Sequence, residues 1–160
     1  MAKKPSGYTE TGRCIGIMAG GTGGHIFPGL TVAKALEARG YEVFWLGAFG
    51  LEHELVPKEN IPLYQLPIKG LRGNGLKGWL LLPWVLGRAI FKACKIFKAK
   101  KPSLIIGFGG YAAAPGGVAA RLLKIPLIIH EQNAAAGLVN RWLAKISTKT
   151  LSGFNTNLPK

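Results

Sequence analysis

The 160-residue sequence contains no aspartate, and all seven of its acidic residues are glutamate. It also has only two cysteines, Cys14 and Cys94, without a pairing pattern around them, so we expect two free thiols in a reducing compartment, one in a strand and one on a helix. The longest apolar run, WLLLPWVLG from Trp79, is far shorter than the roughly 20 residues that span a bilayer. The basic N-terminal segment has an apolar stretch that is too short, too late and too rich in glycine for a signal peptide. We therefore expect neither export nor a membrane-spanning helix.

The few acidic residues are unevenly placed along the chain. Residues 1–60 hold six glutamates and six Lys and Arg, whereas residues 61–160 hold fifteen Lys and Arg and the single acid Glu131. The net charge of +14 therefore comes from the second part of the chain. Such segregation favours a polyanionic partner, either a nucleic acid or an anionic membrane surface, with plain solubility as the alternative.

Short apolar segments alternate with helical patterns along one domain-sized chain. The expected strands are residues 14–19, 41–47, 62–68, 103–109, 125–131 and 149–154. The expected helices are residues 28–39, with Pro28 in the first turn and Gly40 just past the end, and residues 79–100, 115–123 and 138–144. This alternation predicts an α/β fold with a doubly wound, mainly parallel, Rossmann-like sheet over residues 13–160, preceded by a tail of residues 1–12.

Three motifs follow expected strands, and each is rich in glycine or polar groups: GGTGGH at 20–25, GFGGYAAAP at 107–115 and HEQNAAAG at 130–137. In a doubly wound sheet the carboxyl ends of the strands form the ligand-binding edge, so these motifs should converge there. Glycines before a helix N-terminus let the backbone approach a diphosphate or sugar hydroxyls closely.

The first glycine loop does not match the common nucleotide motifs. From Gly21 and Gly23, Ile26 occupies the last place of a G-x-G-x-x-G fingerprint, no acid ends the second strand, and no G-K-[ST] triplet is present. A tight turn without a ligand would explain one or two glycines, but not four together with Thr22 and His25. We therefore interpret the loop as a substrate-binding loop.

Four segments together resemble the amino-terminal half of glycosyltransferase family 28, from about Arg13 to the end of the chain: MAGGTGGHIFPGLTVAKAL, IKGLRGNGLKG, GFGGYAAAPGGVAA and IPLIIHEQNAAAGLVNRWLAK. The resemblance implies a GT-B architecture, in which two Rossmann-like domains face each other, with this chain as the acceptor- and membrane-side domain and the carboxy-terminal UDP-sugar domain absent. It implies inverting transfer of N-acetylglucosamine from UDP-GlcNAc to the MurNAc 4-hydroxyl of lipid I, forming lipid II for peptidoglycan. The chain alone is expected to be inactive. No cofactor or metal is expected, because a chain without Asp has no Asp-x-Asp motif.

The resemblance also assigns roles to individual residues. The candidates for the catalytic base are His25, which we rank first, and Glu131, whose pKa its positive surroundings should lower; a role for either in merely holding a loop stays open. The residues implied to bind UDP-GlcNAc are Thr22, Gly23, Gly24 and Asn133. The residues implied to bind the acceptor are Gly109, Gly110, Tyr111, Arg72 and Gln132. His130 is expected to pack locally and His53 to lie on the surface.

The segment from Lys69 to Lys101 holds nine Lys and Arg and no acid, beside several Trp and Leu residues. On a helix, the cations of residues 88–95 share one face and the apolar residues 86–97 share another. This combination predicts contact with an anionic membrane, with a core helix and a solvated basic face as the alternative. The expected contact residues are Trp79, Leu80, Leu81, Leu82, Trp84, Arg88, Lys92 and Lys95. The location implied is peripheral, on the cytoplasmic face of the bacterial inner membrane.

The sequence also bears on alternative functions. Charge favours nucleic-acid binding, but the chain shows no zinc-ligand spacing, RNP-like aromatic strand or arginine-rich arm, so we expect no nucleic-acid partner. A non-catalytic membrane-docking acceptor subunit of a two-chain glycosyltransferase, or another GT-B enzyme with a lipid acceptor, stays open.

Overall fold

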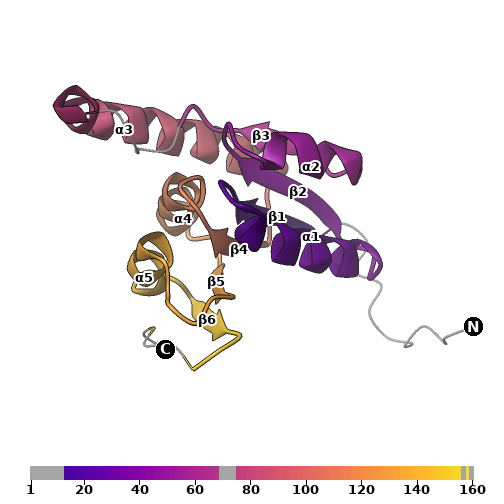
Figure 1. Ribbon diagram of the computed structural model, residues 1–160. Coiled ribbons are helices and arrows are strands. Elements are labelled where there is room, and N and C mark those ends of the chain that lie inside the picture. Colours follow the sequence, from indigo (N-terminus) through magenta and orange to yellow (C-terminus); the bar gives the residue numbers. More distant parts are fainter. Residues whose placement is uncertain (1–12, 69–74, 156–157, 159–160) are drawn as a thin grey trace, which may run out of the picture.

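The computed structural model describes residues 13–68, 75–155 and 158, with backbone alone for 75–80. Its strands are β1 (Cys14–Ala19), β2 (Glu42–Gly47), β3 (Leu63–Gln65), β4 (Leu104–Gly109), β5 (Leu127–Glu131) and β6 (Lys149–Ser152). Its helices are α1 (Gly23–Glu37), α2 (Glu52–Lys58), α3 (Gly75–Lys100), α4 (Ala113–Leu122) and α5 (Leu138–Ala144). The strands form one parallel sheet in the order β3-β2-β1-β4-β5-β6 (Figure 1). This is the doubly wound Rossmann order, so the expected fold class is confirmed.

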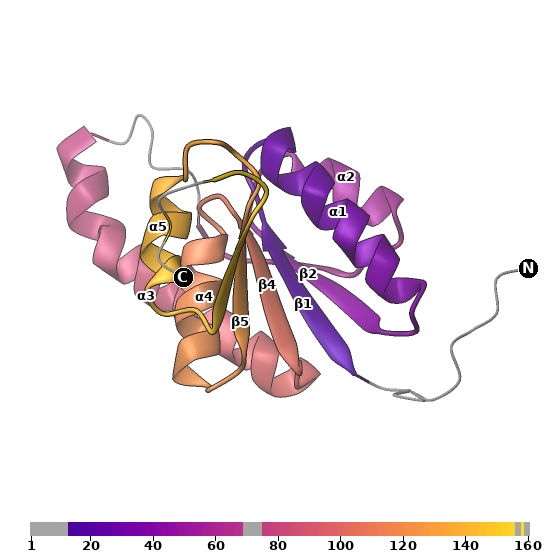
Figure 2. The same ribbon diagram turned by 90° about the horizontal axis from the view of Figure 1, so that it is seen from below.

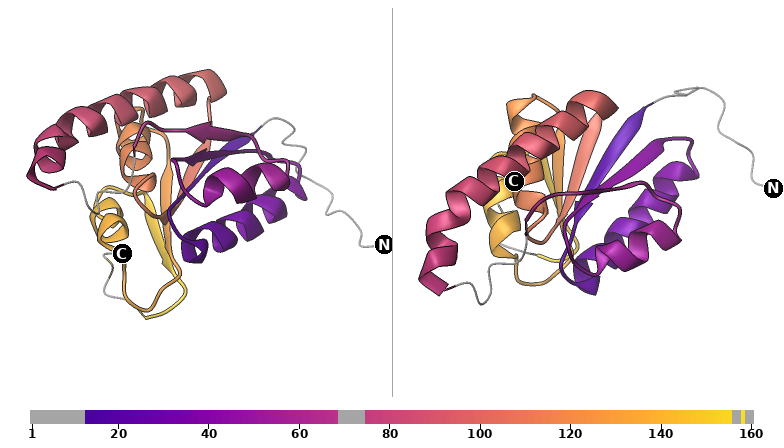
Figure 3. Two further views of the ribbon diagram at one scale, coloured as in Figure 1. Left: turned by 45° about the horizontal axis from the view of Figure 1, so that its top comes forward. Right: turned by 90° about the horizontal axis from the view of Figure 1, so that it is seen from above.

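The helices cover the two faces of the sheet as separate groups (Figure 2). Helices α1 and α2 pack on one face, where Ile26 and Val56 join the central strands in one apolar cluster. Helices α3, α4 and α5 pack on the other face, and the long α3 runs across α4 (Figure 3). The chain changes face at α3, between β3 and β4, so the connections after β1 and β4 lead to opposite faces.

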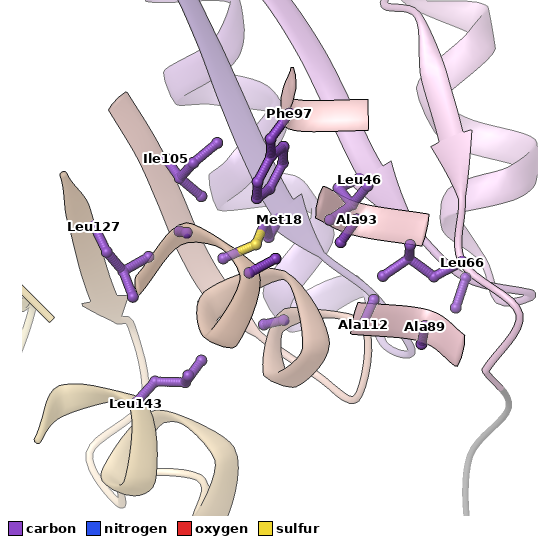
Figure 4. Packing of buried hydrophobic residues seen from close by; sticks show 14 of the residues in the cluster. Met18, Leu46, Leu66, Ala89, Ala93, Phe97, Ile105, Ala112, Leu127 and Leu143 are labelled. Carbon is purple, nitrogen blue, oxygen red and sulfur yellow. The ribbon is translucent and has the colours of Figure 1, made fainter. Parts of the chain in front are cut away.

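The central strands are buried on both faces because helices cover both. In β1, Ile15 and Ile17 face the α1 side, whereas Met18 lies in the cluster formed with α3, α4 and α5. Figure 4 shows this second cluster, in which Phe97 of α3 lies beside Met18 and Leu143 of α5 packs farther along the same face. An uninterrupted apolar run such as CIGIMA is therefore what this position in the sheet requires.

Several element boundaries differ from the sequence-based expectation. Helix α1 begins at Gly23 instead of Pro28, so Pro28 lies in the second turn, where it lacks the N–H that would bond to the Gly24 carbonyl. Helix α3 likewise begins at Gly75 and includes Pro83. Helix α2 was not expected at all, since it is short, polar and contains Pro57. The third strand is limited to Leu63–Gln65, while residues 138–144 form a helix as expected.

The contact between α1 and β2 leaves no room for a side chain at Gly29. A Cβ there would lie 2.6 Å from Cη2 of Trp45, whose indole N–H donates a 3.0 Å hydrogen bond to the Ala19 carbonyl. We expect Gly29→Ala to lower the free energy of unfolding, because overpacking costs about 1–3 kcal/mol while helix propensity returns less than about 1 kcal/mol. Urea denaturation of the purified chain measures the change.

The matched control is Gly87→Ala in α3, where a Cβ would meet no atom within 4 Å. That substitution should raise the free energy of unfolding by about 0.5–1 kcal/mol. Equal stabilisation by both substitutions would contradict the close packing of α1 on Trp45.

Candidate functional site

The loops after β1, β2, β4 and β5 meet at the carboxyl edge of the sheet, around the point between β1 and β4 where the connections diverge. In doubly wound folds this switch point is where ligands bind. Three of the loops carry the motifs expected to converge. We describe this edge as the candidate site.

Glycines let the loops after β1 and β4 touch backbone to backbone. A Cβ on Gly110 would lie 2.0 Å from the carbonyl oxygen of Gly20, and Gly110 has a φ of +82°. Gly109, with a φ of +108°, faces the imidazole of His25: a Cβ on Gly109 would lie 3.0 Å from its Nε2. A side chain at Gly110 would push the two loops apart, and one at Gly109 would displace the His25 imidazole.

His25 lies in the first turn of α1, and its imidazole reaches toward the end of β4. The Thr22 residue that precedes the helix does not cap it; its hydroxyl lies 2.9 Å from Nδ1 of His25 instead. Burial lowers the pKa of His25 below its usual 6.5, while the negative charge of Glu131 acts in the opposite direction. The neutral imidazole therefore predominates at pH 7. If Nδ1 donates its proton to Thr22, Nε2 keeps a free lone pair.

The N-terminus of α1 offers polar groups beside His25. The N–H groups of Gly23 and Gly24 have no hydrogen-bond acceptor among the described residues. Free N–H groups at a helix N-terminus favour anionic or hydroxyl ligands. These two residues and Thr22 were expected to contact UDP-GlcNAc.

Glu131 ends β5 and is fully buried. Its Oε1 accepts hydrogen bonds from the backbone N–H and side-chain amide of Asn133, both at 2.9 Å. Its Oε2 accepts from the Gly137 N–H at 3.0 Å and from the Asn140 amide at 2.9 Å. With both oxygens engaged, the carboxylate holds the loop after β5 and the start of α5.

These hydrogen bonds also explain the acidity of Glu131. Burial raises its pKa, but the bonds from Asn133, Asn140 and Gly137 outweigh burial, so the pKa lies below its ordinary value. The direction agrees with the sequence-based expectation. The cause does not: the expected cationic surroundings are replaced by specific hydrogen-bond donors, because the nearest partners of this carboxylate are amides.

The other residues of the loop after β5 either make contacts within the fold or lie exposed to solvent. Asn133 is exposed, but its side-chain amide donates a hydrogen bond to Glu131. The Gln132 amide donates to the Phe108 carbonyl at 3.1 Å, and His130 packs against the Phe108 ring as expected. Within the described part of the chain, the buried Gln132 Oε1 and Asn140 Oδ1 have no hydrogen-bond partner.

Tyr111 follows the paired glycines of β4 and points toward the loops after β1 and β2. A Cβ on Gly21 would lie 3.1 Å from its ring, and one on Gly50 would lie 2.9 Å from its hydroxyl. Burial and the charge of Glu52 raise the pKa of Tyr111, so the hydroxyl stays protonated and can donate. Of the other expected acceptor residues, Arg72 lies outside the described residues.

Sequence reasoning missed two polar residues at this edge, Glu52 and Asn140. Both are buried; Glu52 binds the loop after β1, 31 residues away, and Asn140 binds Glu131, nine residues away. The position of Glu52 shortly after an expected strand was an available signal, but the short helix that carries it was not recognised. Asn140 lies in a mainly apolar helix pattern, so the sequence did not single it out.

Helix α3 exposes both apolar and cationic side chains. Leu81, Trp84 and Phe91 are 59%, 67% and 66% exposed, and Leu82 is half-buried. Arg88, Lys92 and Lys95 are exposed, with the Lys95 ammonium 5.7 Å from the centre of the Phe91 ring. The opposite side of the helix is buried, as the expected division into two faces requires. The side chains of Trp79 and Leu80 lie outside the described residues.

Further exposed apolar residues lie on the other helices of this face: Leu122, Leu138 and Trp142. No described helix is long and apolar enough to cross a bilayer. Among the described residues, no three His, Cys, Asp or Glu side chains gather as a metal site. The two cysteines are unpaired, as expected.

The strand order and the glycine-lined switch point define a Rossmann-like α/β domain with its binding edge between β1 and β4. The chain belongs to glycosyltransferase family 28, since the profile of the Glycosyltransferase family 28 N-terminal domain matches residues 15–152.

Curated relatives are similar over most of the chain. It is 51% identical over 144 residues to the UDP-N-acetylglucosamine--N-acetylmuramyl-(pentapeptide) pyrophosphoryl-undecaprenol N-acetylglucosamine transferase of Pasteurella multocida, covering 89% of this chain and 41% of the relative. The enzyme of the same name from Cellvibrio japonicus is 54% identical over 140 residues, covering 87% of this chain and 39% of the relative. The chain thus spans about two fifths of the length of these relatives.

Solved structures agree with this assignment. Acinetobacter baumannii MurG superposes with a TM-score of 0.82 at 43% identity, covering 92% of this chain and 43% of that one. The UDP-GlcNAc 2-epimerase from Neisseria meningitidis, at 15% identity and a TM-score of 0.57, shares the fold alone. The match to MurG supports the expectation that this fold is the amino-terminal half of a GT-B architecture.

The hydrogen bonds to Glu131 predict a stability that depends on pH. Glu131→Gln should lower the free energy of unfolding at pH 7 by about 2 kcal/mol, because one amide cannot accept all of these bonds and presents a donor where an acceptor is needed. Since folding lowers the pKa of Glu131, its contribution is complete above the ordinary value of 4.5 and is lost as the pH falls through the lowered pKa. Urea denaturation at pH 7 and at successively lower pH measures the difference.

Glu37→Gln, at an exposed position in α1, is the matched control and should change stability by less than about 0.5 kcal/mol. A difference between wild type and Glu131→Gln that persists undiminished at low pH would contradict the ionised, hydrogen-bonded state of Glu131.

Proposed function

We propose that this chain is the acceptor- and membrane-binding half of an inverting glycosyltransferase. The reaction is transfer of N-acetylglucosamine from UDP-GlcNAc to the MurNAc 4-hydroxyl of lipid I, giving lipid II for peptidoglycan. The partners are UDP-GlcNAc, lipid I and an anionic membrane surface, without nucleic acid, metal or cofactor. Part of the donor site comes from the portion of the relatives that this chain does not cover, so the chain alone is expected to be inactive.

One observation carries the proposal. The chain is about half identical to the curated N-acetylglucosamine transferases, and its glycine loops bring His25 to the switch point of the sheet. A tight turn would need the glycines, but not an imidazole beside them. The combination supports a site where a hydroxyl group is deprotonated.

In the proposed mechanism His25 is the general base. Nδ1–H donates to the Thr22 hydroxyl, and the free Nε2 accepts the proton of the acceptor 4-hydroxyl. The oxygen attacks C1 of N-acetylglucosamine from the side opposite the diphosphate, the bond from C1 to the diphosphate oxygen breaks, and UDP leaves. A positioned base contributes about 10²–10⁴-fold to the rate.

Glu131 serves the same reaction indirectly in this proposal. Both of its oxygens are engaged by hydrogen bonds and its pKa is lowered, so it is a poor proton acceptor. Its negative charge raises the pKa of His25 and therefore stabilises the imidazolium that forms when Nε2 takes the proton. Gly23 and Gly24 offer N–H groups to the donor, and Asn133 lies at the exposed end of the neighbouring loop.

Helix α3 is proposed to dock on the membrane that carries the lipid acceptor. Its exposed Trp84 and Phe91 suit the interface between headgroups and acyl chains, and Lys92 and Lys95 suit anionic headgroups. The proposed location is peripheral, on the cytoplasmic face of the cell membrane.

The role of His25 is tested in a chimaera, in which this chain is followed by the part of the Cellvibrio japonicus relative that it does not cover. We expect His25→Ala to lower turnover from UDP-GlcNAc to a lipid I analogue by at least about 100-fold, because the reaction loses its base. The wild-type activity should fall as the pH drops through the lowered pKa of His25, since the protonated imidazole cannot accept a proton.

His53→Ala, at an exposed position in α2, is the matched control and should leave turnover unchanged. Near-normal turnover of the His25→Ala chimaera would remove His25 from the mechanism. An inactive wild-type chimaera, or full activity of the 160-residue chain alone, would argue against the proposed division of the enzyme.

Membrane docking is tested by flotation of the purified chain with vesicles of phosphatidylcholine, with and without phosphatidylglycerol. We expect binding to require phosphatidylglycerol. Reversing two charges in Lys92→Glu/Lys95→Glu should weaken it by more than tenfold, because each cation near an anionic surface contributes about 1 kcal/mol. Trp84→Ala should weaken binding to the vesicles that contain phosphatidylglycerol.

Lys58→Glu, an exposed charge reversal in α2 on the other face of the sheet, is the control and should have a smaller effect. Equal binding to both kinds of vesicle, or equal effects of the reversals on the two faces, would rule out docking through α3.

A further inference from the structure

A second buried carboxylate lies at the site edge, on the opposite side from Glu131. Glu52 is the first residue of α2 and is fully buried. An ionised carboxylate is costly to bury unless hydrogen bonds satisfy it. Its contacts therefore indicate what it does in the fold.

The Glu52 carboxylate joins two loops. Its Oε2 accepts the N–H of Gly21 at 3.1 Å, from the loop after β1, and its Oε1 accepts the N–H of Ala48 at 2.8 Å, from the loop after β2. These residues lie 31 and 4 positions from Glu52 in the sequence. The carboxylate thus ties the glycine loop of the site to the neighbouring strand connection.

Glycines enclose this carboxylate closely. A Cβ on Gly20 would lie 2.8 Å from Oε1, and one on Gly50 would lie 2.5 Å from Oε2. A Cβ on Gly47 would lie 2.8 Å from the Glu52 Cγ. The side chain therefore has little freedom to move, and side chains at these three positions would displace it.

The link to His25 runs through two residues. Gly21 has a φ of +91° and is held by Glu52 on one side, while the Tyr111 ring packs against it. The next residue is Thr22, whose hydroxyl lies 2.9 Å from His25 Nδ1. The position of Gly21 therefore sets the position of the hydroxyl that orients the imidazole.

We infer that Glu52 is a positioning residue for His25: by holding Gly21, it places the Thr22 hydroxyl so that His25 carries its proton on Nδ1 and leaves Nε2 free. Glu52 itself does not reach the imidazole. The inference rests on the proposed function only for the use made of Nε2, because the hydrogen bonds of Glu52 and the contact between Thr22 and His25 exist without substrate.

The test is nuclear magnetic resonance of the 160-residue chain labelled with ¹⁵N and ¹³C, without ligand. In the wild type we expect a scalar coupling through the hydrogen bond between the Gly21 amide nitrogen and the Glu52 carboxylate carbon. The ring-nitrogen shifts of neutral His25 should show the proton on Nδ1. Absence of the coupling, or a proton on Nε2, overturns the inference whether or not any variant folds.

Two variants displace the carboxylate in different ways. Glu52→Gln replaces one oxygen by an amide donor that faces an N–H group. Gly50→Ala keeps the charge but adds a methyl group against Oε2. In each we expect amide exchange at Gly21 to accelerate at least tenfold and the ring-nitrogen shifts of His25 to move toward a mixture of the two tautomers.

Glu54→Gln, at an exposed position in the same first turn, is the matched control and should leave the His25 signals unchanged. Folded Glu52→Gln and Gly50→Ala chains with wild-type His25 ring signals overturn the inference. In the chimaera, Glu52→Gln should lower kcat more than it changes KM. Failure of transfer in the wild-type chimaera would count against the proposed function and leave the resonance result standing.

Discussion

The contact between the backbones of Gly20 and Gly110 is the constraint on which the site depends. It joins the loops after β1 and β4 at the one point of the sheet where neighbouring connections diverge to opposite faces. A single Cβ at Gly110 would separate them. Because the loops touch, the imidazole of His25 from one loop lies against Gly109 of the other.

Two buried carboxylates hold loops of the same edge. Glu52 holds the loop after β1, and Glu131 holds the loop after β5 together with the start of α5. Both accept N–H groups at the ends of strands, where the ladder of the sheet no longer provides partners. Placing acidic side chains there satisfies exposed donors and fixes loops that could otherwise adopt several conformations. The polar groups beside the proposed base are thereby set before any substrate arrives.

Charge is unevenly distributed along the sequence, and the topology of the chain makes it uneven between the two faces of the sheet. Helices α1 and α2, from the first 60 residues, pack on one face of the sheet and carry the acids Glu37, Glu52 and Glu54. The basic second part forms α3, α4 and α5 on the other face. The change of face at α3 therefore gathers the cations on the side where Trp84 and Phe91 are exposed. Charge and exposed aromatic residues both favour that side as the one that meets an anionic surface.

The sequence by itself determined the strands, the parallel sheet and the loops that converge at its edge. Buried apolar runs such as CIGIMA and glycine loops such as GGTGGH are local signals, and local sterics and burial are enough to interpret them. Only the tertiary structure decided that Glu131 is held by amides, that α1 begins ahead of Pro28, and that Glu52 belongs to the site. The physical reason is that the role of a buried carboxylate depends on its hydrogen-bond partners. The hydrogen-bond partners of Glu52 come from two different loops, one of them 31 residues away. No local sequence pattern predicts such a contact.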